Sequence, residues 1–266
     1  MSILLWIVGF TALGGALSAL AASLFLLLPE AKRVHVLPHL VSFATGALLG
    51  AALIGLLPHA VESAGVAGVH RIGLTLLFGI LVFFLLEKFV LWRHCHTEVC
   101  EGHEEQHVHG QVADHHRDAA SARLILMGDG FHNALDGVLI AAAFMTDLHL
   151  GIVSAVAVIV HEIPQEVGDL AILLHGGMTR AKALMLNLVT SLTSVIGGVV
   201  AFFALGTAMR FLPYAIALAA SSFLYIAVAD LIPGLHRRVD PGSGAKQIAL
   251  IALGVALIYF THETMH

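Results

Sequence analysis

The sequence predicts an all-α fold: a polytopic membrane protein with eight transmembrane helices and both termini outside. Hydrophobic residues make up 58% of the 266 residues and charged residues only 12%, and the mean hydropathy is +0.91. A soluble domain of this length carries more charge. The apolar residues are grouped in runs near 20 residues, the length that a helix needs to cross about 30 Å of hydrocarbon. We therefore interpret residues 1–266 as a single transmembrane domain.

The apolar runs define the expected helices in chain order. The first run lacks the positively charged start and the small-residue cleavage site of a signal peptide, so we expect a retained helix. Most prolines, Pro38 among them, fall near the ends of runs, where a missing N–H is tolerated. Pro164 instead lies inside the fifth run and should kink it, freeing the carbonyl group near Val160. The expected spans are 3–28, 38–58, 72–92, 123–146, 149–175, 180–207, 211–232 and 247–264.

The 13 Lys and Arg residues predict the orientation. If the N-terminus is outside, only Arg71 and Arg210 fall outside, and the other 13 − 2 = 11 basic residues fall inside. Positive residues are enriched in cytoplasmic loops. Both termini are therefore expected on the periplasmic or extracellular side of the cell inner (plasma) membrane.

The long polar tract at residues 93–121 then becomes a cytoplasmic loop between the third and fourth helices. It holds seven histidines and six acidic residues and cannot form a core. Its composition is typical of a flexible loop that contacts metal ions, although a solvated linker can have the same composition. Cys95 and Cys100 lie in this loop, where thiols stay reduced, so we expect no structural disulfide.

Ionisable residues lie inside two of the expected helices, at depths where one charge costs about 2.5–3.5 kcal/mol. In the fourth helix the polar residues are spaced i, i+3, i+4 and i+7 and share one face. A second polar stripe follows in the fifth helix. The two stripes consist of Asp129, His132, Asn133 and Asp136, and of His161, Glu162, Gln165, Glu166 and Asp169.

These two stripes are expected to face each other. The short connection at 147–149 makes the two helices antiparallel neighbours, and facing stripes are hidden from lipid. Neither stripe contains a thiolate or thioether, which argues against Cu(I), whereas imidazole with carboxylate suits Zn²⁺ and also Fe²⁺, Mn²⁺, Co²⁺ or Cd²⁺. The expected cage of nitrogen and oxygen ligands consists of His132, Asn133, Asp136, His161, Gln165 and Glu166.

At these residues the chain resembles the ZIP (Zrt/Irt-like protein) family of divalent metal transporters. The fourth-helix signature His-Asn-x-x-Asp-Gly stands at residues 132–137. The fifth-helix signature His-Glu-x-Pro-His-Glu-x-Gly-Asp, which marks one subfamily, stands at 161–169 with Gln165 in place of the second His. The resemblance extends to residues 42–50, 57–60, 86–88 and 223–225, and to Asp230 and Pro233.

The resemblance implies a transporter that carries Zn²⁺, or Fe²⁺, Mn²⁺ or Cd²⁺, into the cytoplasm. The metal ion is then the transported substrate, and no cofactor is expected. A homodimer in the lipid bilayer is also implied, with an elevator-type motion of helices 1, 4, 5 and 6 against helices 2, 3, 7 and 8. We expect no enzyme activity and no nucleic-acid partner. The expected metal ligands are His132, Asn133, Asp136, His161, Glu162, Gln165, Glu166 and Asp169.

The chain departs from the family pattern at three places. Gln165 replaces an imidazole by an amide, which should weaken the site or change its metal preference. Residues 190–194 contain no carboxylate where some relatives have a sixth-helix Glu that completes a two-metal centre, so we expect one dominant ion. Ala51 and Gly55 replace a second-helix Asp and His, which leaves His59 alone near the outer end.

Four further polar residues have two interpretations each. Asp129 could assist at one end of the path or pair with Arg123. Asp169 could form an exit site or have no role in transport. Asn187 and Ser191 on the sixth helix are expected to make interhelical hydrogen bonds rather than to bind the ion.

Two other functions are less consistent with the sequence. His161 and Glu162 begin the His-Glu-x-x-His pattern of a zinc metalloprotease, but position 165 is Gln, and Pro164 would distort the helix. A haem or quinone electron carrier could use His132 and His161 as axial ligands, but the carboxylates beside them fit that role poorly.

Overall fold

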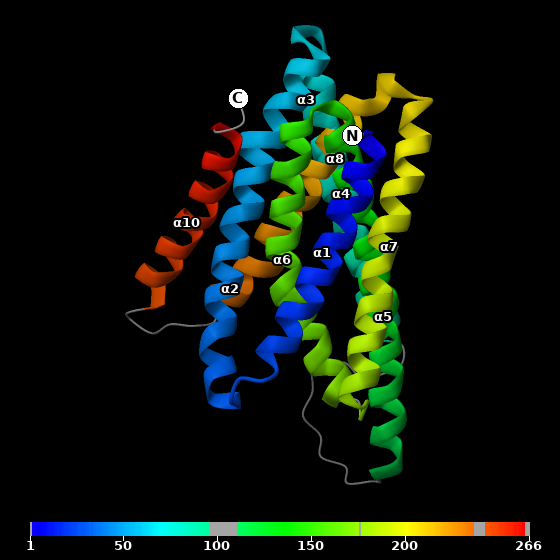
Figure 1. The fold of residues 1–266 in the computed structure, drawn as a ribbon, viewed down its shortest axis with the longest axis vertical. Helices are drawn as coiled ribbons and strands as arrows, with labels where there is room; N and C mark the ends of the chain where they lie inside the picture. The colour runs from blue at the N-terminus through cyan, green and yellow to red at the C-terminus, as the bar shows by residue number, and fades with distance from the viewer. Residues whose placement is uncertain (1, 96–110, 176, 237–242, 264–266) are drawn as a thin grey trace.

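The chain folds into a bundle of long helices that run along one axis (Figure 1). The computed structural model describes residues 2–95, 111–175, 177–236 and 243–263, and within these ranges it contains helices and turns but no strand. Both termini lie at the same end of the bundle, close to the turn between α3 and α4 (Figure 1). The predicted all-helical fold is confirmed for this part of the chain.

Within the described ranges, seven helical segments are long and apolar enough to cross a membrane. They match seven of the eight expected spans and support a multi-pass membrane protein. The expected span at 123–146 is absent from this set and lies within α5 (Gln111–Thr146). Its polar stripe lowers its hydropathy, although its other faces are apolar. Large apolar side chains on the outer faces of the bundle are exposed, as contact with lipid requires; examples are Leu74, Phe78, Ile196 and Ile248.

One group of four helices contains the expected site. α5 packs against both α6 and α7, and α1 packs against α5, α6 and α7. The bounds of the other three helices are Ile3–Phe25 for α1, Leu148–His175 for α6 and Arg180–Gly206 for α7.

The α5–α7 contact is close enough to require glycine. A Cβ atom at Gly137 would collide with the carbonyl oxygen of Ser194, and one at Gly197 would collide with that of Ala134. Small residues of this kind let membrane helices approach backbone to backbone. The close approach fixes α5, and with it the polar stripe that ends at Asp136.

The remaining helices form a second group, in which α2 packs against α10 and α4 against α8. Short π-helical segments, η1 and η4, continue α2 into α3 and α8 into α9, and single 3₁₀ turns, η2 and η3, precede α4 and α8. In chain order the bounds are α2 Glu30–Gly50, η1 Ala51–Leu56, α3 Leu57–Ala64, η2 Val66–Gly68, α4 Val69–Cys95, η3 Met209–Phe211, α8 Leu212–Tyr225, η4 Ile226–Leu231, α9 Ile232–His236 and α10 Ser243–Glu263.

The structure differs from the sequence-based expectation at Pro38 and agrees with it on the position of Pro164. The second helix begins at Glu30 rather than at residue 38, so the expectation that Pro38 lies near a helix end is wrong. Pro164 does lie inside α6, and the helix continues through it to His175. Most of the predicted His-rich loop, residues 96–110, lies outside the described residues, so its contact with metal stays a prediction.

Candidate metal centre

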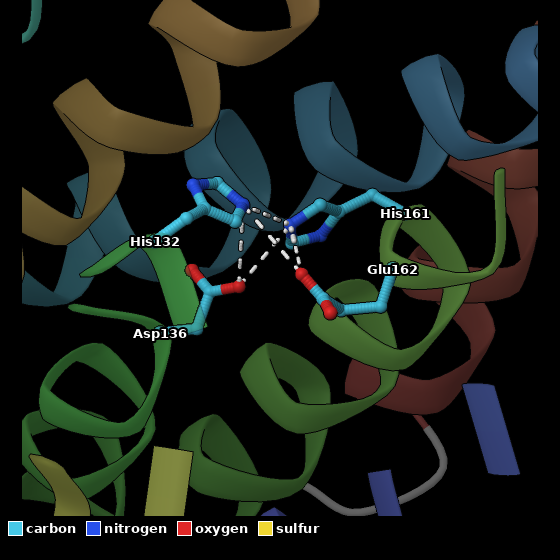
Figure 2. A group of neighbouring side chains, drawn as sticks. All are labelled: His132, Asp136, His161 and Glu162. Atoms are coloured by element: carbon cyan, nitrogen blue, oxygen red, sulfur yellow. Dashed lines mark hydrogen bonds and ion pairs between the residues drawn. The ribbon is translucent and has the colours of Figure 1, made fainter. Parts of the chain in front are cut away.

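Four side chains converge where α5 and α6 face each other. Figure 2 shows His132 and Asp136 of α5 opposite His161 and Glu162 of α6. One ligand atom from each residue lies within 4.8 Å of the ligand atoms of the other three. His132 and Asp136 are one helical turn apart and therefore project from the same face of α5. The two predicted stripes thus meet, at these four residues.

The distances between the four ligand atoms fit a tetrahedral ion. The two Nε2 atoms of His132 and His161 are 3.3 Å apart. Asp136 Oδ2 lies 3.6 and 3.3 Å from them, and Glu162 Oε1 lies 3.6 and 3.7 Å from them. Ligands at about 2.0–2.2 Å from a tetrahedral ion are about 3.3–3.6 Å from one another. The four atoms could therefore bind one small divalent cation with little movement.

Burial and charge also favour a cation at this position. Asp136, His161 and Glu162 are 1%, 2% and 3% exposed. Neither oxygen of Asp136 and neither oxygen of Glu162 has a hydrogen-bond partner among the described residues. Buried, unpaired carboxylates are costly, and two of them balance the charge of one divalent cation held by two neutral imidazoles.

His161 is oriented by its surroundings. Its Nδ1 lies 3.1 Å from the carbonyl oxygen of Ala157. Because a carbonyl oxygen only accepts hydrogen bonds, Nδ1 carries the proton. The lone pair of Nε2 therefore points toward the space between the four ligand atoms, where a cation would bind. On the other side, the ring of Phe223 in α8 lies 6.1 Å from the imidazole ring. This packing holds the imidazole in the orientation that a metal ligand needs.

A second group adjoins the first and shares Glu162. One carboxylate oxygen each of Asp129, Glu162 and Glu166 lie within 4.8 Å of one another, and all three residues are buried. Asn133 Nδ2 donates to Asp129 Oδ1 at 2.8 Å. The side-chain nitrogen of Asn133, an expected ligand, is therefore hydrogen-bonded to Asp129. Asp129 lies four residues before Asn133 and therefore on the same face of α5, so the sequence already indicated that the two side chains could meet.

The sixth helix contributes one hydrogen bond to this second group. Ser191 Oγ donates to Glu166 Oε1 at 2.8 Å, and both residues are buried. The expected interhelical hydrogen bond is therefore present at Ser191. One turn away, Asn187 is fully buried, and neither polar atom of its amide has a partner among the described residues. The expected hydrogen bond at Asn187 is absent in this part of the chain.

Replacing Ser191 by alanine should destabilise the protein by about 1–3 kcal/mol, because a buried Glu166 oxygen would lose its donor. Thermal unfolding of the purified protein in detergent measures the change. Ser194→Ala is the matched control, since Ser194 is also buried on α7 but does not bond Glu166. Equal unfolding temperatures for the two variants would contradict the role of this hydrogen bond.

Gln165 and Asp169 lie beside a cavity and outside both groups. The cavity has a volume of about 380 Å³ and is also lined by His132 of α5 and by Tyr225 and Asp230 of the second helix group. Gln165 and Asp169 lie one and two turns beyond His161 on α6, so the cavity extends from His132 toward the end of the bundle where α6 ends and α5 begins. Gln165 thus lines the cavity and Glu162 belongs to the group of four, and the ligand role expected of each stays a prediction.

His59, which lacks the second-helix Asp and His of some relatives, has a neighbour from another helix at the other end of the bundle. Its ring lies 5.7 Å from that of His262 in α10. Nearby, Asp147 caps α6 by accepting from the backbone N–H groups of His149 and Leu150 at 2.8 and 3.1 Å. Burial opposes ionisation of Asp147, but these hydrogen bonds outweigh it and hold the pKa of Asp147 below its ordinary value.

Comparison with known proteins points to one family. The family model described as "ZIP Zinc transporter" matches residues 3–262. The chain is 28% identical to the zinc transporter zipt-7.1 of Caenorhabditis briggsae, over 96% of the chain and 78% of the relative. It is 29% identical to an uncharacterized zinc transporter of Schizosaccharomyces pombe, over 82% and 61%. It is 31% identical to the zinc transporter ZIP13 of Pongo abelii, over 86% and 67%.

Proposed function

The chain belongs to the ZIP zinc transporter family, and from this premise we propose that it carries Zn²⁺ into the cytoplasm through His132, Asp136, His161 and Glu162. Members of the family are transporters and not enzymes, and a divalent metal ion is their substrate rather than their cofactor. The metalloprotease and electron-carrier alternatives are therefore set aside.

One observation carries the assignment of the site: four ligand atoms, from two imidazoles and two carboxylates, have the spacing of a tetrahedral centre, and Asp136, His161 and Glu162 are buried. Zn²⁺ prefers four such ligands in this geometry. The same nitrogen and oxygen ligands also suit Fe²⁺, Mn²⁺ or Cd²⁺. Because the net charge of the four ligands and one divalent ion is zero, the ion can be buried here without a further counter-charge.

The second group of ligands, Asp129, Glu162 and Glu166, and the cavity provide an inward path for the ion. Glu162 belongs to both groups, so an ion can pass from the first group to Asp129 and Glu166 without losing contact with Glu162. Gln165 and Asp169 line the cavity that follows. Oxygen ligands alone bind Zn²⁺ less tightly than oxygen with imidazole, which favours release in this direction. Asn133 serves this path by positioning Asp129.

The membrane arrangement that we propose has eight transmembrane helices, with both termini outside the cell inner (plasma) membrane. α5 supplies the eighth helix, since it packs along α6 and α7, both of which are long and apolar enough to span. An even number of spans requires both termini on one side, and both lie at one end of the bundle (Figure 1).

The two helix groups support an elevator-type motion. All the ligands proposed here lie on α5 and α6, which pack with α1 and α7. Movement of these four helices as one rigid body against α2, α4, α8 and α10 would carry the ion across the membrane without separating its ligands from one another. A homodimer joined through the second group of helices, α2, α4, α8 and α10, would keep those helices fixed. The exposed apolar faces would remain in contact with lipid.

Competition among metal ions tests the substrate. In proteoliposomes, uptake of radioactive zinc is measured with an equal excess of Zn²⁺, Cd²⁺, Co²⁺, Fe²⁺ or Mn²⁺. We expect Zn²⁺ and Cd²⁺ to compete most strongly and Mn²⁺ least, because imidazole ligands favour the later and softer ions. Stronger competition by Mn²⁺ than by Zn²⁺ would contradict the proposed substrate, and protein-free liposomes give the background rate.

A further inference from the structure

A cavity of about 290 Å³ lies at the end of the bundle that contains both termini, far along the helices from the metal ligands. It opens between the start of α4 and the start of α8. Its lining includes Arg71, Arg210, Ser63 and Tyr214. The volume is close to the lower end of the range of about 300–1,000 Å³ that small-ligand pockets occupy. A small polar group would therefore fill it.

The cavity is positively charged and contains no matching acid. Arg71 and Arg210 are the two basic residues that the orientation places outside, and both line this one cavity. Within the described ranges, neither guanidinium forms an ion pair with a carboxylate. Glu62 is the acidic residue adjacent to Ser63 in sequence, but it does not line the cavity. Both arginines are exposed, so water and salt screen their mutual repulsion in part, and an anion bound between them would be attracted by both.

Other features of the cavity favour an anion in the same place. Arg210 is held over the ring of Phe211, with its Cζ 4.8 Å from the ring centroid, which leaves the edges of the guanidinium to donate. The hydroxyl groups of Ser63 and Tyr214 add hydrogen-bond donors. α4 and α8 lie side by side and both begin at the cavity, so the positive ends of both helix dipoles add to the potential.

We propose that this cavity binds a phosphate group through Arg71 and Arg210. The forked guanidinium matches phosphate oxygens in pairs, and a phosphate fits between two such groups. Two sources share this chemistry: the headgroup of an anionic phospholipid and free inorganic phosphate. The cavity lies at the end of the helix bundle, where the headgroups of surrounding phospholipids could reach it.

The test uses the purified full-length protein in detergent and the charge-removing double variant Arg71→Gln with Arg210→Gln. Thermal unfolding is measured with phosphatidylglycerol, with phosphatidylcholine, with sodium phosphate, and with sodium chloride at equal ionic strength. Native mass spectrometry counts retained phosphatidylglycerol. The control is Arg180→Gln with Lys182→Gln, which also removes two exposed positive charges, from the other end of the bundle.

We expect phosphatidylglycerol to raise the unfolding temperature of the wild-type and control proteins. The double variant should show no such rise, and its affinity for phosphatidylglycerol should be at least about tenfold lower than that of wild type. If sodium phosphate raises the unfolding temperature of wild type by the same amount and does not raise that of the double variant, free phosphate is the occupant. The assignment of a phosphate site at Arg71 and Arg210 is then supported. No rise in wild type with either compound, or the same rise in the double variant, would overturn the proposal.

A variant that keeps the charges covers the case in which the double variant does not fold. Arg71→Lys with Arg210→Lys retains both charges but loses the forked geometry. We expect this variant to unfold like wild type in sodium chloride and to bind phosphatidylglycerol severalfold more weakly. Binding equal to wild type would overturn the two-arginine assignment. Zinc uptake should be unchanged in a variant that folds, because neither arginine belongs to the metal path.

Discussion

Replacing Glu162 by glutamine is expected to reduce zinc uptake by roughly 10- to 100-fold, more than any other single conservative change in the centre. Glu162 belongs to both ligand groups, whereas every other ligand belongs to one. A hydrogen bond to a charged group contributes about 1.5–3 kcal/mol, each 1.4 kcal/mol is about a factor of ten in an equilibrium constant, and we expect the loss of one charged ligand to be of this size. Initial uptake rates in proteoliposomes measure the loss.

The same variant separates a transport role from a structural one. Glutamine has nearly the size of glutamate and removes a buried charge that has no hydrogen-bond partner in the described part of the chain. Without metal, Glu162→Gln should therefore unfold at the same temperature as wild type or higher. Glu62→Gln makes the same chemical change at an exposed residue and should leave uptake unchanged. Uptake within twofold of wild type for Glu162→Gln would contradict its assignment as the shared ligand.

Replacing Gly137 by alanine is expected to destabilise the protein by about 2–3 kcal/mol and to abolish most zinc uptake. The added Cβ would collide with the backbone of α7 at Ser194, and a backbone cannot yield as a side chain can. Since α5 must move away from α7, the neighbouring Asp136 would lose its position beside His161. Thermal unfolding and uptake are both measured.

Gly128→Ala is the matched control because it lies on the same helix and its added Cβ would meet no atom within 4 Å. Alanine is favoured over glycine in a helix by about 0.5–1 kcal/mol, so this control should be as stable as wild type or more stable. The two variants are thus expected to change stability in opposite directions. A Gly137→Ala protein as stable as Gly128→Ala would show that the close α5–α7 contact is not required.

The spans were predictable because membrane crossing imposes both a length and a composition. Seven of the expected runs coincide with helices that could cross a bilayer. The start of α2 at Glu30 was missed because the first turns of α2 are polar, and a hydropathy pattern does not detect a polar extension of an apolar helix. The π-helical segments, such as Ala51–Leu56, leave no comparable signal in composition.

The candidate site was predictable in its residues but not in their arrangement. Helical spacing places Glu162, Gln165 and Glu166 on one stripe, and the stripe is wide enough to touch several neighbours at once. Which residue faces α5 depends on the rotation and depth of α6 against it, and these are set by packing across the whole bundle. In the structure Glu162, an expected ligand that the six-residue cage left out, belongs to the group of four, and the side chain of Asn133 donates to Asp129.

Anomalous diffraction at the zinc edge, from crystals of the protein grown with Zn²⁺, locates the bound ion. We expect a peak between His132 and His161, with Asp136 and Glu162 completing the shell at about 2.0–2.2 Å. Crystals of His132→Ala with His161→Ala should lose that peak. Zinc peaks found elsewhere in the wild-type protein, with none between these four side chains, would show that they are not the metal centre.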